Sequence, residues 1–188
     1  MSDLLDKVIA DQDPFKKILG KIPGFSGYIE RQSRRDADKL LRETIAREYD
    51  AQWQRISTLQ KEMLSQGDLI HVDDLEAAAI KLRTFIDRVR NASYGYSSLF
   101  DAVKINEEEL ARLYQFDAAL LGMADEVSGA LDNVESAIGT EGLPAAIRVL
   151  VNLAAKCVET FNRRRDVIIQ AAPSASSDQP ALPDQPAQ

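Results

Sequence analysis

The hydrophobic positions between Asn106 and Ile138 recur at intervals of three and four residues, with no proline among them. This spacing is typical of an amphipathic helix that packs lengthwise on other helices. The apolar positions are Leu110, Leu113, Leu120, Ala124, Val127, Leu131, Val134 and Ile138, and Asp117 takes the one remaining position of the series. Glu109, three residues after Asn106, gives a capping-box-like start, and Gly139 gives the stop. Residues 106–138 are therefore predicted as one long helix.

A partner helix is predicted over residues 143–171, after the short connection 139–142. Such a short connection makes the two helices an antiparallel hairpin. The repeating positions of the second helix are Leu143, Ile147, Leu150, Ala154, Cys157, Phe161, Arg164 and Ile168. Folding the hairpin about its turn places Asp117 opposite Arg164, and we expect an ion pair that sets the register. The alternative is that Arg164 turns to solvent among the neighbouring arginines.

Two further helices precede this hairpin. Residues 26–66 contain no proline and carry the stripe Leu41, Ile45, Tyr49, Trp53, Ile56, Leu59 and Met63. Residues 73–93 carry the stripe Leu75, Ala79, Leu82, Ile86 and Val89, and this helix continues brokenly to residue 104. The sequence thus predicts an all-α fold over residues 26–171: an elongated antiparallel four-helix bundle in which the chain runs up, down, up and down.

The middle of the predicted hairpin is lined by small residues, Gly122 and Gly129 among them. Glycine inside a helix costs about 0.5–1 kcal/mol relative to alanine, so we expect a packing reason for keeping it. The side chains best placed to fill the thin layer are those of Trp53, Tyr49 and Phe85. Cys157 falls in the same layer and is predicted to be a small buried hydrophobic residue, not a nucleophile.

The two ends of the chain differ from the helical body. Residues 1–25 form a short amphipathic arm, apolar on one side and carrying Lys16, Lys17 and Lys21 on the other. The arm either lies on a membrane surface or in the groove of a partner, or it folds back over the open end of the bundle. Residues 172–188 are rich in proline, alanine and serine and are predicted to be a disordered tail.

The first third of the 26–66 helix is polar on almost all sides and is the best candidate for a binding surface. Arg31, Arg34, Arg35 and Arg42 lie near one face, and a guanidinium group suits carboxylate or phosphate groups on a partner. The alternative is an ordinary solvated face on which Asp38 pairs with arginines of its own helix.

Tyr94 and Tyr96 flank Gly95 where the 73–93 helix breaks. They form either a contact for a small molecule or peptide, or an aromatic plug in a helix kink. His71, the only histidine, is predicted in the loop before this helix, where it has no partner histidine for metal binding or catalysis. The chain also lacks a glycine-rich phosphate loop, a CxxC motif and an HExxH motif. We therefore expect no metal, no cofactor and no enzymatic activity.

Charge and composition narrow the class of partner. The 188 residues include 30 acidic and 23 basic residues, and the formal net charge is −7. An acidic chain is a poor general binder of nucleic acid, because phosphate contacts supply most of the non-specific affinity. No stretch approaches about 18 consecutive apolar residues, so no transmembrane helix is expected. The single cysteine and the acidic start favour a cytoplasmic protein.

The sequence therefore favours a non-enzymatic helical-bundle protein that mediates protein–protein interaction or scaffolding. Its partner would be another protein or a second copy of the chain, met through the basic helix end and the N-terminal arm. One alternative is a peripheral membrane or lipid-binding protein whose arm lies on an anionic surface. The other is a nucleic-acid accessory factor that uses the arginines of the first helix.

Overall fold

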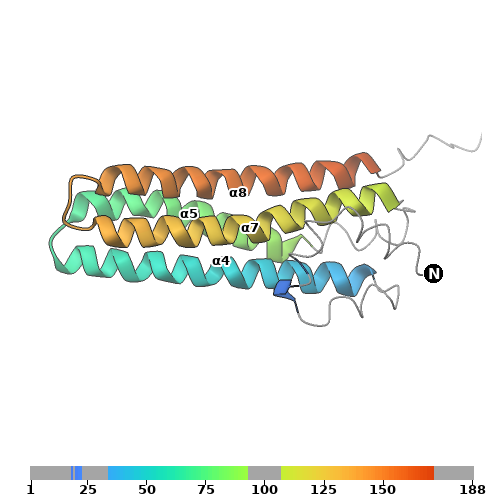
Figure 1. Ribbon diagram of the computed structural model, residues 1–188, viewed down its shortest axis with the longest axis horizontal. Helices are drawn as coiled ribbons and strands as arrows, with labels where there is room; N and C mark the ends of the chain where they lie inside the picture. Colours follow the sequence, from blue (N-terminus) through green and yellow to red (C-terminus); the bar gives the residue numbers. More distant parts are fainter. Residues whose placement is uncertain (1–17, 19, 23–33, 93–106, 172–188) are drawn as a thin grey trace, which may run out of the picture.

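The computed structural model describes residues 18, 20–22, 34–92 and 107–171. Four long helices account for most of them: α4 (Arg34–Ser65), α5 (Leu69–Asn91), α7 (Glu107–Ala137) and α8 (Leu143–Ala171). The helices lie side by side in one elongated bundle (Figure 1), and the described residues contain no strand. The predicted all-α four-helix bundle is confirmed.

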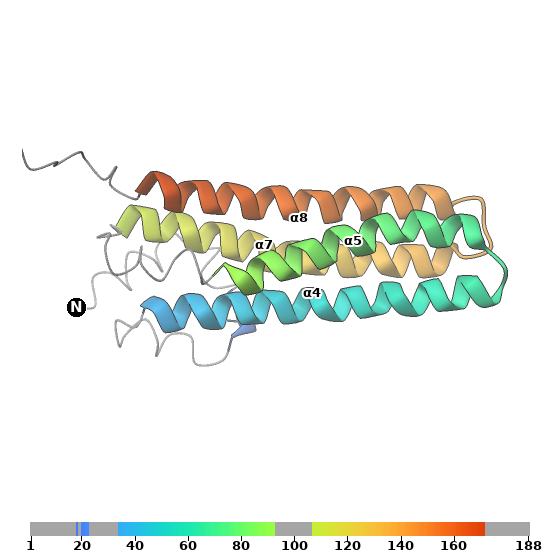
Figure 2. The ribbon, with the colours of Figure 1, turned by 180° about the vertical axis from the view of Figure 1, so that it is seen from behind.

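The direction of the chain alternates from helix to helix, and the α4–α5 and α7–α8 turns lie at the same end of the bundle (Figure 2). Helix α4 packs against α5 and α7, and α8 packs against the same two helices. The two hairpins are therefore antiparallel within themselves, whereas the neighbours α4 and α7, like α5 and α8, run in the same direction. The sequence predicts the alternating directions but not which helices become neighbours across the two hairpins.

Backbone hydrogen bonds around Gly67 fix the turn between α4 and α5. Gly67 has a φ of +80°, and the Asp68 N–H donates to the Met63 carbonyl at 3.0 Å, as in a Schellman ending. The Asp68 carboxylate then caps α5 by accepting the backbone N–H of His71 at 3.3 Å. Because of this cap, α5 begins earlier than predicted, at Leu69, and His71 lies in its first turn and not in a loop.

The α7–α8 hairpin agrees closely with its prediction. Helix α7 is one residue shorter at each end than predicted, and α8 has the predicted bounds. Gly139 ends α7 with a φ of +76°. Of the predicted contact positions with described side chains, Ile138 after the end of α7 is only partly buried. The others are each at most 5% exposed: Leu113, Asp117, Leu120, Ala124, Val127, Leu131 and Val134 on α7, and Leu143, Ile147, Leu150, Ala154, Cys157, Phe161 and Arg164 on α8. The hairpin therefore supplies one continuous wall of the core.

Aromatic rings from the other hairpin fill the middle of this wall. The ring centroids of Tyr49 and Phe85 lie 4.5 Å apart, and those of Phe85 and Phe161 lie 5.9 Å apart. Trp53 is only partly buried, and the Arg83 guanidinium lies 5.3 Å from the centre of its ring. Tyr49 and Phe85 are thus the side chains that fill the thin layer.

The expected packing reason for the two glycines of α7 is wrong. A Cβ atom added to Gly122 or to Gly129 would meet nothing within 4 Å. Neither glycine is needed for a close approach of another helix, so both carry the helix-propensity cost without a packing gain in the described structure.

Several predicted segments lie outside the described residues. They are the tail 172–188, most of the arm 1–25, the helix start 26–33 and the broken continuation 93–104.

Candidate functional site

Four charged side chains meet inside the half of the bundle that holds the beginning of α4 and the end of α8. Arg164 Nε donates to Asp117 Oδ1 at 2.7 Å, and Arg164 Nη2 donates to Asp38 Oδ1 at 2.7 Å. Arg42 Nε donates to the second Asp38 oxygen at 2.8 Å, and its Nη1 reaches the Val89 carbonyl at 3.4 Å. The four charged side chains form a neutral cluster, which we call the ionic layer, and with the Val89 carbonyl it involves all four helices.

Burial works against each charge in this layer, and the partners offset the cost. Burial raises the pKa of the Asp117 carboxyl above its ordinary value, although Arg164 beside it lowers that pKa in part. For Arg164, burial acts to lower the pKa, but the carboxylates of Asp117 and Asp38 raise it well above its ordinary value. Arg164 therefore stays positively charged, and its hydrogen bonds hold both carboxylates in place.

The structure forms the Asp117–Arg164 pair that the hairpin register predicts, and Arg164 does not turn to solvent: it is 1% exposed. The prediction that Arg42 belongs to an exposed arginine row is wrong, because Arg42 is 6% exposed and bonded to Asp38. The alternative interpretation of Asp38 and Arg42 as an intrahelical pair is correct in its partners. That interpretation expected a solvated pair, whereas both side chains are buried.

A second polar contact lies deeper in the core, at Tyr49. The Tyr49 hydroxyl donates to the Leu120 carbonyl at 2.7 Å and accepts the Cys157 S–H at 3.4 Å. Burial raises the pKa of the Cys157 thiol to about 11 and also raises the pKa of the Tyr49 phenol. Both groups are held neutral, which favours a packing role for them and disfavours a nucleophilic one.

A short N-terminal turn, made of residues 18 and 20–22, packs on the side of the bundle. The Ile22 N–H donates to the Ile18 carbonyl at 2.9 Å, and both isoleucines are buried in the core cluster. Lys21 Nζ donates to Asp125 Oδ1 at 2.7 Å and to the Leu121 carbonyl at 3.4 Å, so the turn is fixed to α7. Both ribbon views also show it beside α4 (Figures 1 and 2). The described part of the arm therefore folds onto the flank of the bundle and not over its open end.

More sides of α4 are buried near its N-terminal end, where the N-terminal turn lies beside it (Figure 1), than near its C-terminal end. Towards its C-terminal end the buried residues are Ile56, Leu59 and Met63, which form a single stripe. Towards its N-terminal end Thr44 is buried as well, at 1% exposed. Thr44 lies about three helical turns before Arg55 and so shares its side of α4. Arg55 Nη2 donates to Asp132 of α7 at 2.6 Å, which shows that this side faces α7.

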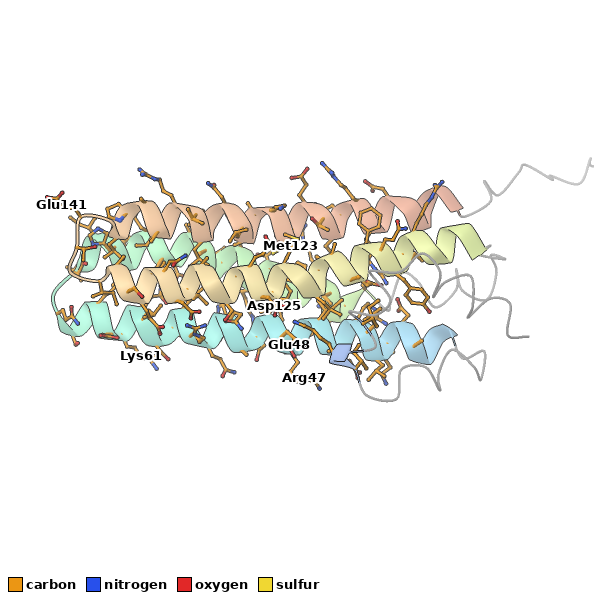
Figure 3. The ribbon with its side chains drawn as sticks, viewed as in Figure 1. Arg47, Glu48, Lys61, Met123, Asp125 and Glu141 are labelled. Carbon is orange, nitrogen blue, oxygen red and sulfur yellow. The ribbon has the colours of Figure 1, made fainter. Side chains whose placement is uncertain are left out.

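Helix α7 carries a second stripe that faces the same flank. Its first half is apolar and buried, with Tyr114, Ala118 and Leu121 at three- and four-residue spacing. Its second half is polar, with Asp125, Ser128 and Asp132. Arg55 of α4 binds the last two directly, whereas Asp125 is bound by Lys21 of the N-terminal turn. Figure 3 shows Asp125 between α7 and α4, on the side of the bundle where the turn lies.

The other predicted binding residues are placed only in part. Arg34 and Arg35 lie in the first turn of α4, but their side chains are outside what the structure describes. The other five predicted residues also lie outside the described residues: Arg31, Lys16, Lys17, Tyr94 and Tyr96. The basic surface they would form stays a prediction. Sequence reasoning missed Asp125 and the second stripe of α7, although its three- and four-residue spacing is visible in the sequence.

Neither a membrane span nor a metal cluster is found in the part of the chain that the structure describes. None of its helices is both long and apolar enough to cross a membrane. Over the same residues, no three side chains of histidine, cysteine, aspartate or glutamate are grouped to hold a metal ion. Comparisons with protein-family models, with curated proteins and with solved structures find no match for this chain.

Proposed function

We propose that this chain is a non-enzymatic helical-bundle protein that mediates protein–protein interaction or scaffolding. One observation carries the proposal: the flank between α4 and α7 holds an amphipathic turn, with Ile18 and Ile22 buried and Lys21 bonded to Asp125. Placing the apolar face of a helix in a groove is a common way for proteins to recognise one another. The N-terminal arm and the basic start of α4, with Arg34 and Arg35, are the proposed contact regions.

The state of the buried titratable groups supports a role without catalysis. A nucleophile or a general base needs a pKa close to the working pH. Burial instead raises the pKa of Cys157 to about 11, and the Asp38 and Asp117 carboxylates are bound by arginines. These groups are used to close the core of the bundle.

The same contacts weigh against the two alternatives. A lipid-binding arm would insert its apolar side into the membrane, but Ile18 and Ile22 are buried in the protein. A nucleic-acid factor would need free basic side chains, but Arg42 is bound to Asp38 and Lys21 to Asp125. A protein partner can contact the basic start of α4 while these contacts stay in place, and this is the interaction we propose.

Affinity capture with the full-length chain, followed by cross-linking and mass spectrometry, tests this function. We expect a specific protein to be enriched, with cross-links to the arm or to the start of α4. The triple charge reversal Arg31→Glu, Arg34→Glu and Arg35→Glu should lower its recovery, and Arg148→Glu on α8 serves as the matched control. Flotation of the wild-type chain with phosphatidylserine vesicles, lost in Lys16→Glu with Lys17→Glu, would overturn the proposal in favour of a membrane role.

A further inference from the structure

The flank between α4 and α7 holds the N-terminal turn through two buried isoleucines and the Lys21–Asp125 ion pair. We call it the flank groove and define it by Thr44 of α4 and by Ala118, Leu121 and Asp125 of α7. Three of these side chains are at most 3% exposed. By helical spacing Thr44 shares its side of α4 with Arg55 and Ala118 shares its side of α7 with Asp125, and the side chains of Arg55 and Asp125 are 31% and 70% exposed. A residue on such a side of its helix is buried only where another part of the protein covers it. In this half of the bundle the N-terminal turn lies on the flank between α4 and α7, with Lys21 on Asp125.

We propose that the flank groove is the docking site for an amphipathic basic helix of a protein partner, and that the N-terminal turn is its built-in competitor. The inference goes beyond the proposed function, because it adds the flank groove to the contact regions proposed above and names the class of partner helix that this groove would take. The partner helix would carry two apolar residues four positions apart and a lysine or arginine just before the second. This is the pattern with which Ile18, Lys21 and Ile22 occupy the groove.

The N-terminal turn is suited to leave while the bundle stays folded. A single helical turn is marginal by itself, because nucleation of a helix is unfavourable. Its ion pair is partly open to water, with the side chain of Lys21 30% exposed and that of Asp125 70% exposed. The four long helices are joined independently of the turn, by the ionic layer and by the Arg55 contacts to α7. The described turn is held by two buried isoleucines and one partly exposed ion pair, and an element held by fewer contacts than the rest of the fold opens at a lower free energy than global unfolding.

The charge of α7 selects a basic occupant. Asp117 is bound in the ionic layer and Asp132 is bound by Arg55, so Asp125 is the carboxylate of the flank groove that an incoming helix can meet. This carboxylate would repel an anionic lipid surface or a nucleic acid, whereas a lysine or arginine placed like Lys21 would bind it.

A tether explains why a partner helix, and not the arm of a second copy, is the occupant that we propose. The chain's own turn acts at an effective concentration on the order of millimolar, because it is attached to the bundle. An identical turn on a second copy makes the same contacts without that advantage. A longer helix from a partner can add contacts along α4 and α7 and so displace the turn.

The first test measures binding of a fluorescein-labelled peptide with the sequence of residues 13–25 to the full-length chain by fluorescence anisotropy. In the released variant, Ile18→Ser with Ile22→Ser, the groove loses its occupant, and we expect the peptide to bind at least tenfold more tightly than to the wild type. Ile80→Ser, at a residue 57% exposed on α5, is the matched control and should bind like the wild type. A peptide with both isoleucines changed to serine should not bind.

The second test exchanges the charges. In the released variant, Asp125→Lys should weaken binding of the peptide at least fivefold, and a peptide with Lys21→Glu should recover most of that loss. Glu126→Lys makes the same change of charge at the exposed neighbouring residue and should leave the affinity within twofold. Recovery by the reversed pair would place the peptide lysine at Asp125.

Four results of measurements on the purified chain would overturn the inference. They are equal peptide affinity for the wild type and the released variant, no response to the charge exchange, and loss of cooperative unfolding in the released variant. The fourth is a wild-type dimer in light scattering that dissociates in the released variant, because it would make a second copy the occupant. A captured partner that binds the wild type and the released variant equally would leave the proposed function standing and remove only this groove. Peptide binding without any captured partner would leave the flank groove standing and remove the proposed function.

Discussion

Arg164 Nη2 on α8 donates to Asp38 Oδ1 on α4 at 2.7 Å, across the diagonal of the bundle. The same guanidinium binds Asp117 on α7, so one side chain joins its own helix to two others. Arg42 extends the connection to the Val89 carbonyl on α5. The ionic layer thus fixes not only the register within the α7–α8 hairpin but also how that hairpin sits against α4 and α5.

Removing one member of the Asp117–Arg164 pair should cost far more than removing both. Asp117→Leu leaves Arg164 with a single carboxylate and Arg164→Met leaves Asp117 without its cation, so each should lower the free energy of unfolding by about 3–5 kcal/mol. The double variant keeps the neutral pair of Asp38 and Arg42, and we expect its stability within about 1 kcal/mol of the wild type. Urea unfolding of the four proteins gives the coupling directly. Losses that simply add in the double variant would show that the two residues act independently.

The sequence predicts only the part of the ionic layer that forms within one hairpin. Asp117 and Arg164 are the polar members of two regular stripes joined by a short turn, so their pairing follows from spacing alone. Asp38 and Arg42 look like a solvated pair, because nothing in the sequence of α4 says that α8 lies across from it. Their burial is decided by how the two hairpins pack.

The place where the N-terminal turn docks likewise depends on how distant helices pack. The amphipathic pattern around Ile18 and Ile22 is plain in the sequence, but its docking place depends on two helices far along the chain. The signal was available in α7, where Tyr114, Ala118 and Leu121 add a second apolar stripe beside the hairpin seam. A helix with two apolar faces needs a second contact, and the N-terminal turn supplies part of it.

Substitution of Gly129 by alanine should stabilise the protein. The added Cβ would meet no atom within 4 Å, so the gain is the helix propensity of alanine, about 0.5–1 kcal/mol in the free energy of unfolding. Gly67→Ala is the contrasting control, since the φ of +80° at that position disfavours any residue with a Cβ by about 1–2 kcal/mol. Thermal and urea unfolding should therefore shift in opposite directions for the two variants. A loss of stability in Gly129→Ala would mean that this face of α7 is covered.

Tyr49→Phe should separate the hydrogen bonds of Tyr49 from its packing. Phenylalanine keeps the ring that contacts Phe85 but loses the bonds to the Leu120 carbonyl and to the Cys157 thiol. We expect a loss of about 1 kcal/mol in the free energy of unfolding. Tyr49→Ala also removes the ring and should cost about 3–5 kcal/mol. Urea unfolding compares the two, and equal losses would show that the ring itself contributes little.

The buried thiol of Cys157 should make the protein less stable at alkaline pH. Burial raises the pKa of this thiol from 9.0 to about 11 in the folded chain, so the unfolded chain loses the proton first as the pH rises. Because the folded state then holds more protons, the free energy of unfolding falls between about pH 9 and about pH 11 and is unaffected by this group at lower pH. A difference of about two pKa units corresponds to a loss of roughly 2–3 kcal/mol.

Cys157→Ala removes this loss. Tyr49 is present in both proteins, but part of the rise in its pKa comes from Cys157, so the comparison measures the coupled pair of Cys157 and Tyr49. The variant should be less stable than the wild type at pH 8, where it has lost the packing of the sulfur atom. The difference should then shrink, or change sign, as the pH rises to 11. Urea unfolding at pH 8, 9, 10 and 11 measures both curves. Parallel curves would mean that the thiol ionises equally readily in the folded and unfolded chains, and that the layer around Tyr49 and Cys157 is open to water.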